Sequence, residues 1–235
     1  MPETVTVTTP DGEMGLYDAP PEGDARAAVI VVQEAFGVNH HIEDVTRRFA
    51  GAGYRAVSPH LFHRTGDPTL PYDDFSQIMP HMQALSDKGI GDDLDATLAY
   101  LAGAGFEAGR VGIVGFCMGG TVSFYAAARY PLGAAVTFYG GGVASGRFGY
   151  PSQVDEAPHL RTPWLGLYGD RDQSIPVEEV EQLRAAAGRA TVATEVVRYP
   201  EADHGFHCDA RASYHQPSAE DAWRRTLDWF GHHLG

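Results

Sequence analysis

The stretch VGIVGFCMGGTVSF, Val111 to Phe124, contains a strand, a turn flanked by glycines and the start of a helix. Its valines and isoleucine favour a buried strand, and the small and apolar residues from Thr121 onward favour a helix. Between them, Gly115 to Gly119 have the G-x-S-x-G spacing of a nucleophile elbow, with cysteine in place of serine. The pattern predicts that Cys117 is raised above the sheet, where the amino terminus of the helix favours its thiolate form.

Strand-like and helix-like segments alternate on both sides of this stretch. An edge hairpin is predicted around the Pro-Asp-Gly turn near the start of the chain. Further strands are predicted within AAVIVVQEAFG and YRAVSPHLF and at 134–139, 163–168 and 194–199, with helices within HIEDVTRRFAGAG and GDDLDATLAYLAGAG, around 73–85, at 177–187 and at the end of the chain. We therefore expect a single α/β domain over residues 1–235, with a mostly parallel, twisted sheet of about eight strands and helices on both faces.

The composition argues against several classes of protein. The chain is 43% apolar and 20% charged, as in an ordinary globular domain. Its net charge of −14 argues against nucleic acid or an anionic membrane as a partner. We find neither the pattern of a secretory signal nor an apolar run of about 18 residues, the length of a membrane helix. We expect a cytoplasmic monomer or small homo-oligomer in which Cys117 and Cys208 are free thiols.

Polar residues follow four of the predicted strands, at the edge where parallel sheets bind their ligands. Besides Cys117 they are Glu34 in VVQEAFGV, Asp172 in LYGDRDQSIP and His204 in YPEADHGFH. The chain order of nucleophile, acid and histidine is that of the α/β-hydrolases. Asp170 is a second acid in the same turn, and shaping that turn is its simpler role. The alternative for Cys117 is a buried, inert cysteine, because free cysteine packs like a small apolar residue.

Taken together, these motifs resemble the dienelactone hydrolase family of α/β-hydrolases. The resemblance covers nearly the whole chain, in the order QEAFGV, GFCMGG, GDRDQSIP, ADHGFH and EDAWRRTLDWF. It implies a single α/β-hydrolase domain with a catalytic triad of Cys117, His204 and Asp172. It also implies an oxyanion hole formed by the backbone amides of Ala35 and Met118.

The same resemblance implies a cofactor-free hydrolase of a small lactone or activated ester. The thiolate would attack the carbonyl carbon, and water would hydrolyse the resulting thioester. Glu34 is implied to hold the resting thiol by a hydrogen bond until substrate binding releases the thiol toward His204. A thiolate suits enol lactones and thioesters, because with amides and alkyl esters the tetrahedral intermediate expels sulfur before the poorer leaving group departs.

The sequence departs from the family at the residues that would hold a substrate carboxylate. Where the family has arginines, this chain has Cys208 and a segment, 72–82, that contains neither Arg nor Lys. Arg211 and Arg64 are the candidate replacements. Because the sequence shows no cationic clamp, we expect an anionic dienelactone to have no advantage over a neutral enol lactone or aryl ester.

Other functions remain open from the sequence. A thiol-based redox protein would use Cys117 with Cys208 as the resolving thiol, although the chain has no C-x-x-C motif. A thioesterase or acyltransferase would use the same triad, whereas a silent binding module would have lost one of its members. The histidine pairs at 60–63 and 204–207 each lack a third ligand at a typical spacing, so we expect no metal site.

Overall fold

The sheet is built around β5 (Val111–Phe116), the strand of the elbow, whose six residues are all buried. In the computed structural model, which describes residues 1–235, the strand order is β1-β2-β4-β3-β5-β6-β7-β8. The other strands are β1 (Glu3–Thr9), β2 (Gly12–Ala19), β3 (Ala28–Val32), β4 (Arg55–Pro59), β6 (Ala134–Phe138), β7 (Trp164–Gly169) and β8 (Thr194–Tyr199). Strands β3 to β8 run parallel, and the β1–β2 hairpin joins them antiparallel at one edge. The predicted α/β fold with a mostly parallel sheet is confirmed.

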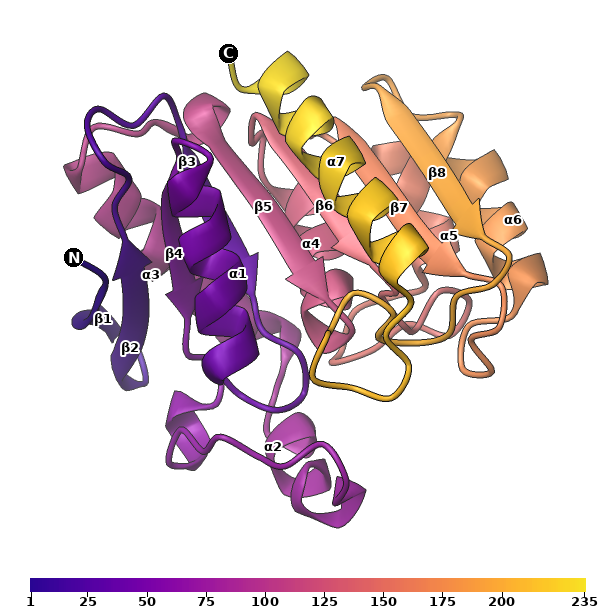
Figure 1. Ribbon diagram of the computed structural model, residues 1–235, viewed down its shortest axis with the longest axis horizontal. Coiled ribbons are helices and arrows are strands. Elements are labelled where there is room, and N and C mark those ends of the chain that lie inside the picture. The colour runs from indigo at the N-terminus through magenta and orange to yellow at the C-terminus, as the bar shows by residue number, and fades with distance from the viewer.

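Helices cover both faces of the sheet (Figure 1). The view shows α1 and α7 on the near face and α3, α4 and α6 on the far face. Their bounds are α1 (His40–Gly51), α3 (Asp87–Gly103), α4 (Met118–Arg129), α6 (Val177–Ala187) and α7 (Gln216–His233). The near-face helices meet through aromatic rings, because Phe230 of α7 packs against Phe49 of α1 and the adjacent Tyr54. None of the helices combines the length and the apolar character needed to cross a bilayer.

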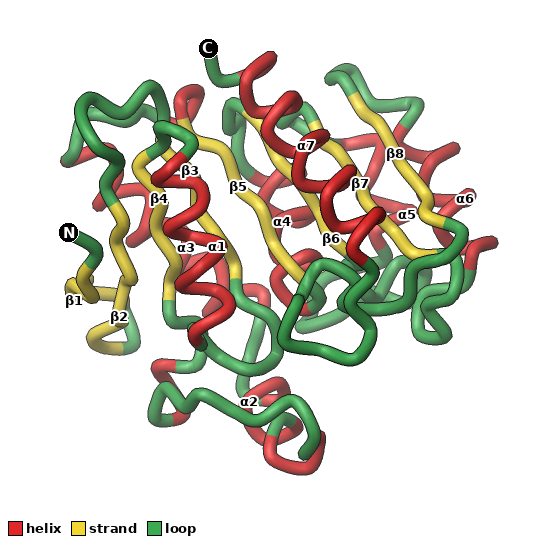
Figure 2. Tube along the Cα trace, in the orientation of Figure 1, coloured by secondary structure: helices red, strands yellow, loops and turns green.

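The segment between β4 and α3 projects beyond the carboxyl edge of the sheet, where long loops also gather (Figures 1 and 2). The helix expected around 73–85 is broken here into a 3₁₀ turn, η2 (Phe75–Gln77), and a short helix, α2 (Met79–Gln83). Asp74 caps the first turn through its carboxylate, and Pro80 lies at the start of the second, where its missing N–H interrupts helical hydrogen bonding. The other short elements are η1 (His63–Thr65), η3 (Ala108–Arg110), α5 (Gln153–Glu156) and η4 (Ala157–His159).

The two glycines of the elbow are required by a close approach of backbones. A Cβ atom on Gly115 would lie 1.8 Å from the carbonyl oxygen of Gly119. A Cβ atom on Gly119 would lie 2.3 Å from the carbonyl oxygen of Val32, in β3. Any side chain at either position would therefore push α4 away from the centre of the sheet.

We expect Gly115→Ala to lower the free energy of unfolding by about 3 kcal/mol or more, because its methyl group would overlap backbone that has no room to move. Urea unfolding followed by circular dichroism measures the loss. The control is Gly231→Ala in α7, where a Cβ meets nothing within 4 Å. This control should gain up to about 1 kcal/mol from helix propensity, and equal stabilities of the two variants would contradict the close packing of β5 on α4.

Candidate active site

Cys117 occupies the turn between β5 and α4 in a strained backbone conformation. Its φ of 55° and ψ of −112° lie outside the regions that residues with a side chain prefer. Such a conformation costs on the order of 1–3 kcal/mol and persists only where the surrounding structure imposes it. Here the hydrogen bond from the Cys117 amide to the Phe138 carbonyl, 3.1 Å long, helps to hold the turn. The side chain consequently leaves the sheet and lines a cavity at its carboxyl edge.

His204 is oriented by the buried Asp172. Nδ1 of His204 lies 2.6 Å from Oδ2 of Asp172. The other oxygen of Asp172 accepts hydrogen bonds from the amide and the hydroxyl of Ser174, at 2.8 and 2.6 Å. Asp170, the other acid of this turn, is held in a bidentate ion pair by Arg198. The structure therefore brings Asp172, and not Asp170, to the histidine.

The electrostatics of the site favour a thiolate–imidazolium pair. Burial raises the pKa of the Cys117 thiol, but the positive charge of His204 and a hydrogen bond to it bring that pKa below its ordinary value. Burial lowers the pKa of His204, whereas the Cys117 thiolate and Asp172 raise it to about 10. Since Nδ1 faces Asp172, it is Nε2 that faces the sulfur.

Glu34 forms a second charged pair beside the thiol. Its side chain is completely buried, and one carboxylate oxygen lies 3.2 Å from Nη1 of Arg211. Its other oxygen has no hydrogen-bond partner. The hydrogen bond expected between Glu34 and Cys117 is not formed here, and the carboxylate pairs with Arg211 instead.

Of the two arginines suggested for substrate binding, only Arg211 lines the cavity. Arg64 is a correction to the sequence analysis. Its guanidinium lies 2.8 Å from one oxygen of the buried Asp93 and 2.9 Å from the other, and its Nε lies 2.7 Å from Asp11. These acids hold Arg64 away from the thiol. The packing of the chain decides which acids pair with an arginine on a loop. The spacing of residues along the sequence does not reveal these partners.

The expected oxyanion donors are two backbone amides that have no hydrogen-bond partner within the protein. Ala35 lines the cavity, and its amide donates no hydrogen bond to the protein. Met118 is the first residue of α4, where a backbone amide has no partner within its own helix. Both amides are therefore available to a ligand oxygen.

Arg147, which none of the sequence motifs indicated, also lines this cavity of about 720 Å³. It lies in the glycine-rich loop after β6. A cation after a parallel strand, at the edge that carries the other polar residues, was the signal that could have revealed it.

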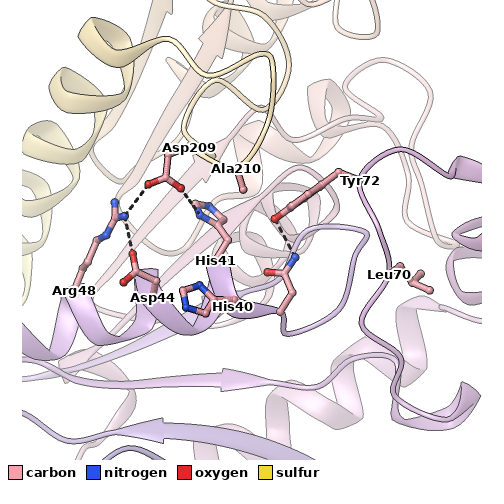
Figure 3. Close-up of a pocket in the computed structure, with 9 residues that line it drawn as sticks. His40, His41, Asp44, Arg48, Leu70, Tyr72, Asp209 and Ala210 are labelled. Carbon is pink, nitrogen blue, oxygen red and sulfur yellow. Dashed lines mark hydrogen bonds and ion pairs between the residues drawn. The ribbon is translucent and has the colours of Figure 1, made fainter.

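A second cavity, of about 530 Å³, lies beside the loop that carries His204 (Figure 3). Asp209 of that loop pairs with Arg48 of α1 at 3.3 Å and lies 3.5 Å from Nδ1 of His41. Arg48 also pairs with Asp44, at 2.6 Å. These contacts tie the loop to α1.

Each histidine of the two pairs has its own neighbours in the fold. His60 pairs with Asp67, and His63 with Asp93, while His204 belongs to the site described above. His207 is 3% exposed and stacks on Phe116 at 5.1 Å between ring centroids. Burial, with the charges of His41 and Arg48, lowers the pKa of His207 to about 3.

The burial of neutral His207 makes the stability of the protein sensitive to acid. Because its folded-state pKa lies below the unfolded value of about 6.5, its contribution is complete above that pH and is lost as the pH falls. Between pH 7 and pH 5 the free energy of unfolding should drop by about 2 kcal/mol on this account. His207→Phe, which keeps the aromatic contacts, should remove that part of the drop in urea titrations. The exposed His232→Phe should retain it.

Glu34→Gln should make Cys117 ionise at a lower pH, because a negative charge next to the thiolate is removed while Arg211 stays. The measurement is the rate of alkylation by iodoacetamide as a function of pH, compared with the exposed control Glu201→Gln. Superimposable profiles for the wild type and Glu34→Gln would mean that Glu34 does not act on the thiol.

Comparison with known proteins assigns the chain to a family. The profile of the dienelactone hydrolase family matches residues 14–234. A "Putative carboxymethylenebutenolidase" of Salmonella typhimurium is 40% identical over 251 aligned residues, covering 97% of this chain and 92% of that protein. A Synechocystis protein of the same name is 34% identical over 239 residues, covering 97% and 96%. The crystal structure of a "Putative Dienelactone Hydrolase" from Klebsiella pneumoniae is 41% identical, covers 98% of both chains and superposes with a TM-score of 0.91. The chain therefore belongs to the dienelactone hydrolase family, as its motifs predicted.

Proposed function

We propose that this chain hydrolyses a small lactone or activated ester of the carboxymethylenebutenolidase type through the Cys117 thiolate, with His204 as acid and base and Asp172 as its orienting group. The observation that supports this most directly is the alignment of the three groups. Asp172 lies 2.6 Å from one nitrogen of His204, Cys117 and His204 line the same cavity, and the charge of His204 lowers the pKa of the thiol.

Acylation begins from the thiolate–imidazolium pair. The sulfur attacks the carbonyl carbon of the substrate, and the negative charge on the carbonyl oxygen is stabilised by the amides of Ala35 and Met118. When the tetrahedral intermediate collapses, the bond to the leaving oxygen breaks and Nε2 of His204 gives that oxygen its proton. The product of this half-reaction is a thioester on Cys117 and a neutral His204.

Deacylation uses the same groups with their roles reversed, because His204 now accepts a proton and Cys117 is the leaving group. Neutral His204 removes a proton from water, and the resulting hydroxide attacks the thioester carbonyl. Collapse of the second intermediate expels the Cys117 thiolate and releases the acid. Asp172 stabilises the imidazolium that forms in both steps, which agrees with its burial and with the bonds from Ser174 that hold it in place.

The redox alternative has less support. Cys208 is buried, and its Sγ lies 3.4 Å from the hydroxyl of Tyr72. Burial, helped by the charge of Glu34, raises the pKa of Cys208 to about 11. A resolving cysteine needs an accessible thiolate, so this environment is unsuited to that role. A thioesterase would follow the same chemical steps with sulfur as the leaving atom.

Cys117→Ala and His204→Ala should each lower kcat/KM for p-nitrophenyl acetate by about 10³-fold or more, because the groups act as one unit. Asp172→Asn should lower it less. The matched control is Cys208→Ala, which should retain turnover and its inhibition by iodoacetamide. Wild-type turnover by Cys117→Ala would overturn the assigned nucleophile, and full activity of Asp172→Asn would remove Asp172 from the mechanism.

A further inference from the structure

The cavity above Cys117 has one apolar wall. Phe75 and Met79 are 64% and 53% exposed, which makes them two of the few large apolar side chains that the protein leaves in solvent. Both line this cavity, together with the buried Ile78, Met82 and Phe36. Exposed apolar side chains that converge on a cavity are typical of a ligand-binding surface.

The apolar wall belongs to the η2–α2 segment, which projects beyond the sheet (Figure 1). Phe36 anchors it from the side of β3, with ring centroids 6.3 Å from Phe75 and 4.5 Å from Tyr72. Methionine side chains adapt to apolar groups of different shape. The wall is therefore fixed at its base and adaptable where Met79 and Met82 face the cavity.

Arg147 supplies a positive charge to the same cavity. Its guanidinium makes no hydrogen bond and no ion pair within the protein, and it lies 5.2 Å from the centre of the Phe148 ring. Its Nη1 lies only 3.0 Å from where a Cβ of Gly141 would be, and Gly141 also lines the cavity. The side chains of Arg129 and Arg189 also lack such partners, but neither of them reaches the thiol.

The loop that carries Arg147 is held in place by its neighbours. The amide of Tyr150 donates to the Arg147 carbonyl at 2.9 Å, and the ring of Tyr150 stacks on Tyr125 with 4.0 Å between centroids. Tyr125 is buried in α4, the helix that follows the elbow. The loop that carries the unpaired guanidinium is thus anchored to α4, the helix that follows Cys117.

We propose, on the basis of the hydrolase function above, that the substrate is amphipathic, with an apolar body against the wall of Phe75 and Met79 and an anionic end bound by Arg147. A charge-assisted hydrogen bond from a guanidinium to a carboxylate would position the far end of the substrate while its carbonyl lies at Cys117. Arg211 lines the cavity too, but Glu34 already occupies its guanidinium. The presence of Arg147 therefore reverses the expectation, drawn from the sequence, that an anionic substrate is not preferred over a neutral one.

The charge is tested with two substrates that differ only at the far end, the mono-p-nitrophenyl ester of suberic acid and the methyl ester of that compound. We expect the wild type to prefer the free acid by about tenfold in kcat/KM at low ionic strength, and less at high salt. Arg147→Gln should abolish this preference, whereas the control Arg189→Gln, an exposed arginine that also lacks an ion pair, should keep it. Because the charge of Arg147 also acts on the thiol, the ratio between the two substrates is the readout.

The apolar wall is tested in the same way with p-nitrophenyl hexanoate and p-nitrophenyl acetate. Phe75→Ser and Met79→Ser should each lower the ratio of their kcat/KM values by about fivefold to tenfold, which corresponds to the loss of about one to two buried methylene groups. Tyr214→Ser, at another exposed apolar residue outside the cavity, should leave the ratio unchanged.

Equal rates with the acid and its methyl ester, or a preference that survives Arg147→Gln, would overturn the anionic subsite. An unchanged acyl-chain ratio in both serine variants would overturn the apolar one. In either case Cys117-dependent turnover of p-nitrophenyl acetate would still uphold the proposed function. The loss of that dependence is the result that would refute the function itself.

Discussion

The close contact between the backbones of β5 and α4 is the constraint on which the rest of the site depends. Neither Gly115 nor Gly119 has room for a single methyl group. Because the chain turns from strand to helix in so short a distance, Cys117 adopts a left-handed conformation and its side chain leaves the sheet. The amide dipoles of α4 then lie beneath the sulfur and favour a negative charge there.

Two charged pairs, Cys117 with His204 and Glu34 with Arg211, lie at this site. Each pair neutralises charge that would otherwise be costly to bury beside the other. Asp172 stabilises a charged His204, which in turn stabilises the Cys117 thiolate. Without a partner, the fully buried Glu34 would place an uncompensated negative charge beside that thiolate, a costly arrangement in the protein interior. Arg211 provides the balancing charge, so a thiolate and a buried acid coexist at one edge of the sheet.

The groups proposed to react and those proposed to surround a substrate lie on different connections. Cys117, Asp172 and His204 follow β5, β7 and β8, whereas the apolar wall and Arg147 lie on the connections before α3 and after β6. Those connections are nevertheless restrained, by Phe36 in one case and by the stack of Tyr150 on Tyr125 in the other. The same division is general among α/β enzymes, where a rigid sheet carries the chemistry and loops adapt it.

The sequence by itself determined the order of strands and helices, the elbow and the chain order of Cys117, Asp172 and His204. These follow from apolar periodicity and from motifs a few residues long, which act over short distances along the chain. Only the tertiary structure decided which charges meet, and it assigned Arg64 to the buried Asp93, Arg211 to Glu34 and no partner to Arg147. Such pairings join residues far apart in the sequence through long, flexible side chains. Their choice therefore depends on how the connections fold over the sheet and not on any local pattern.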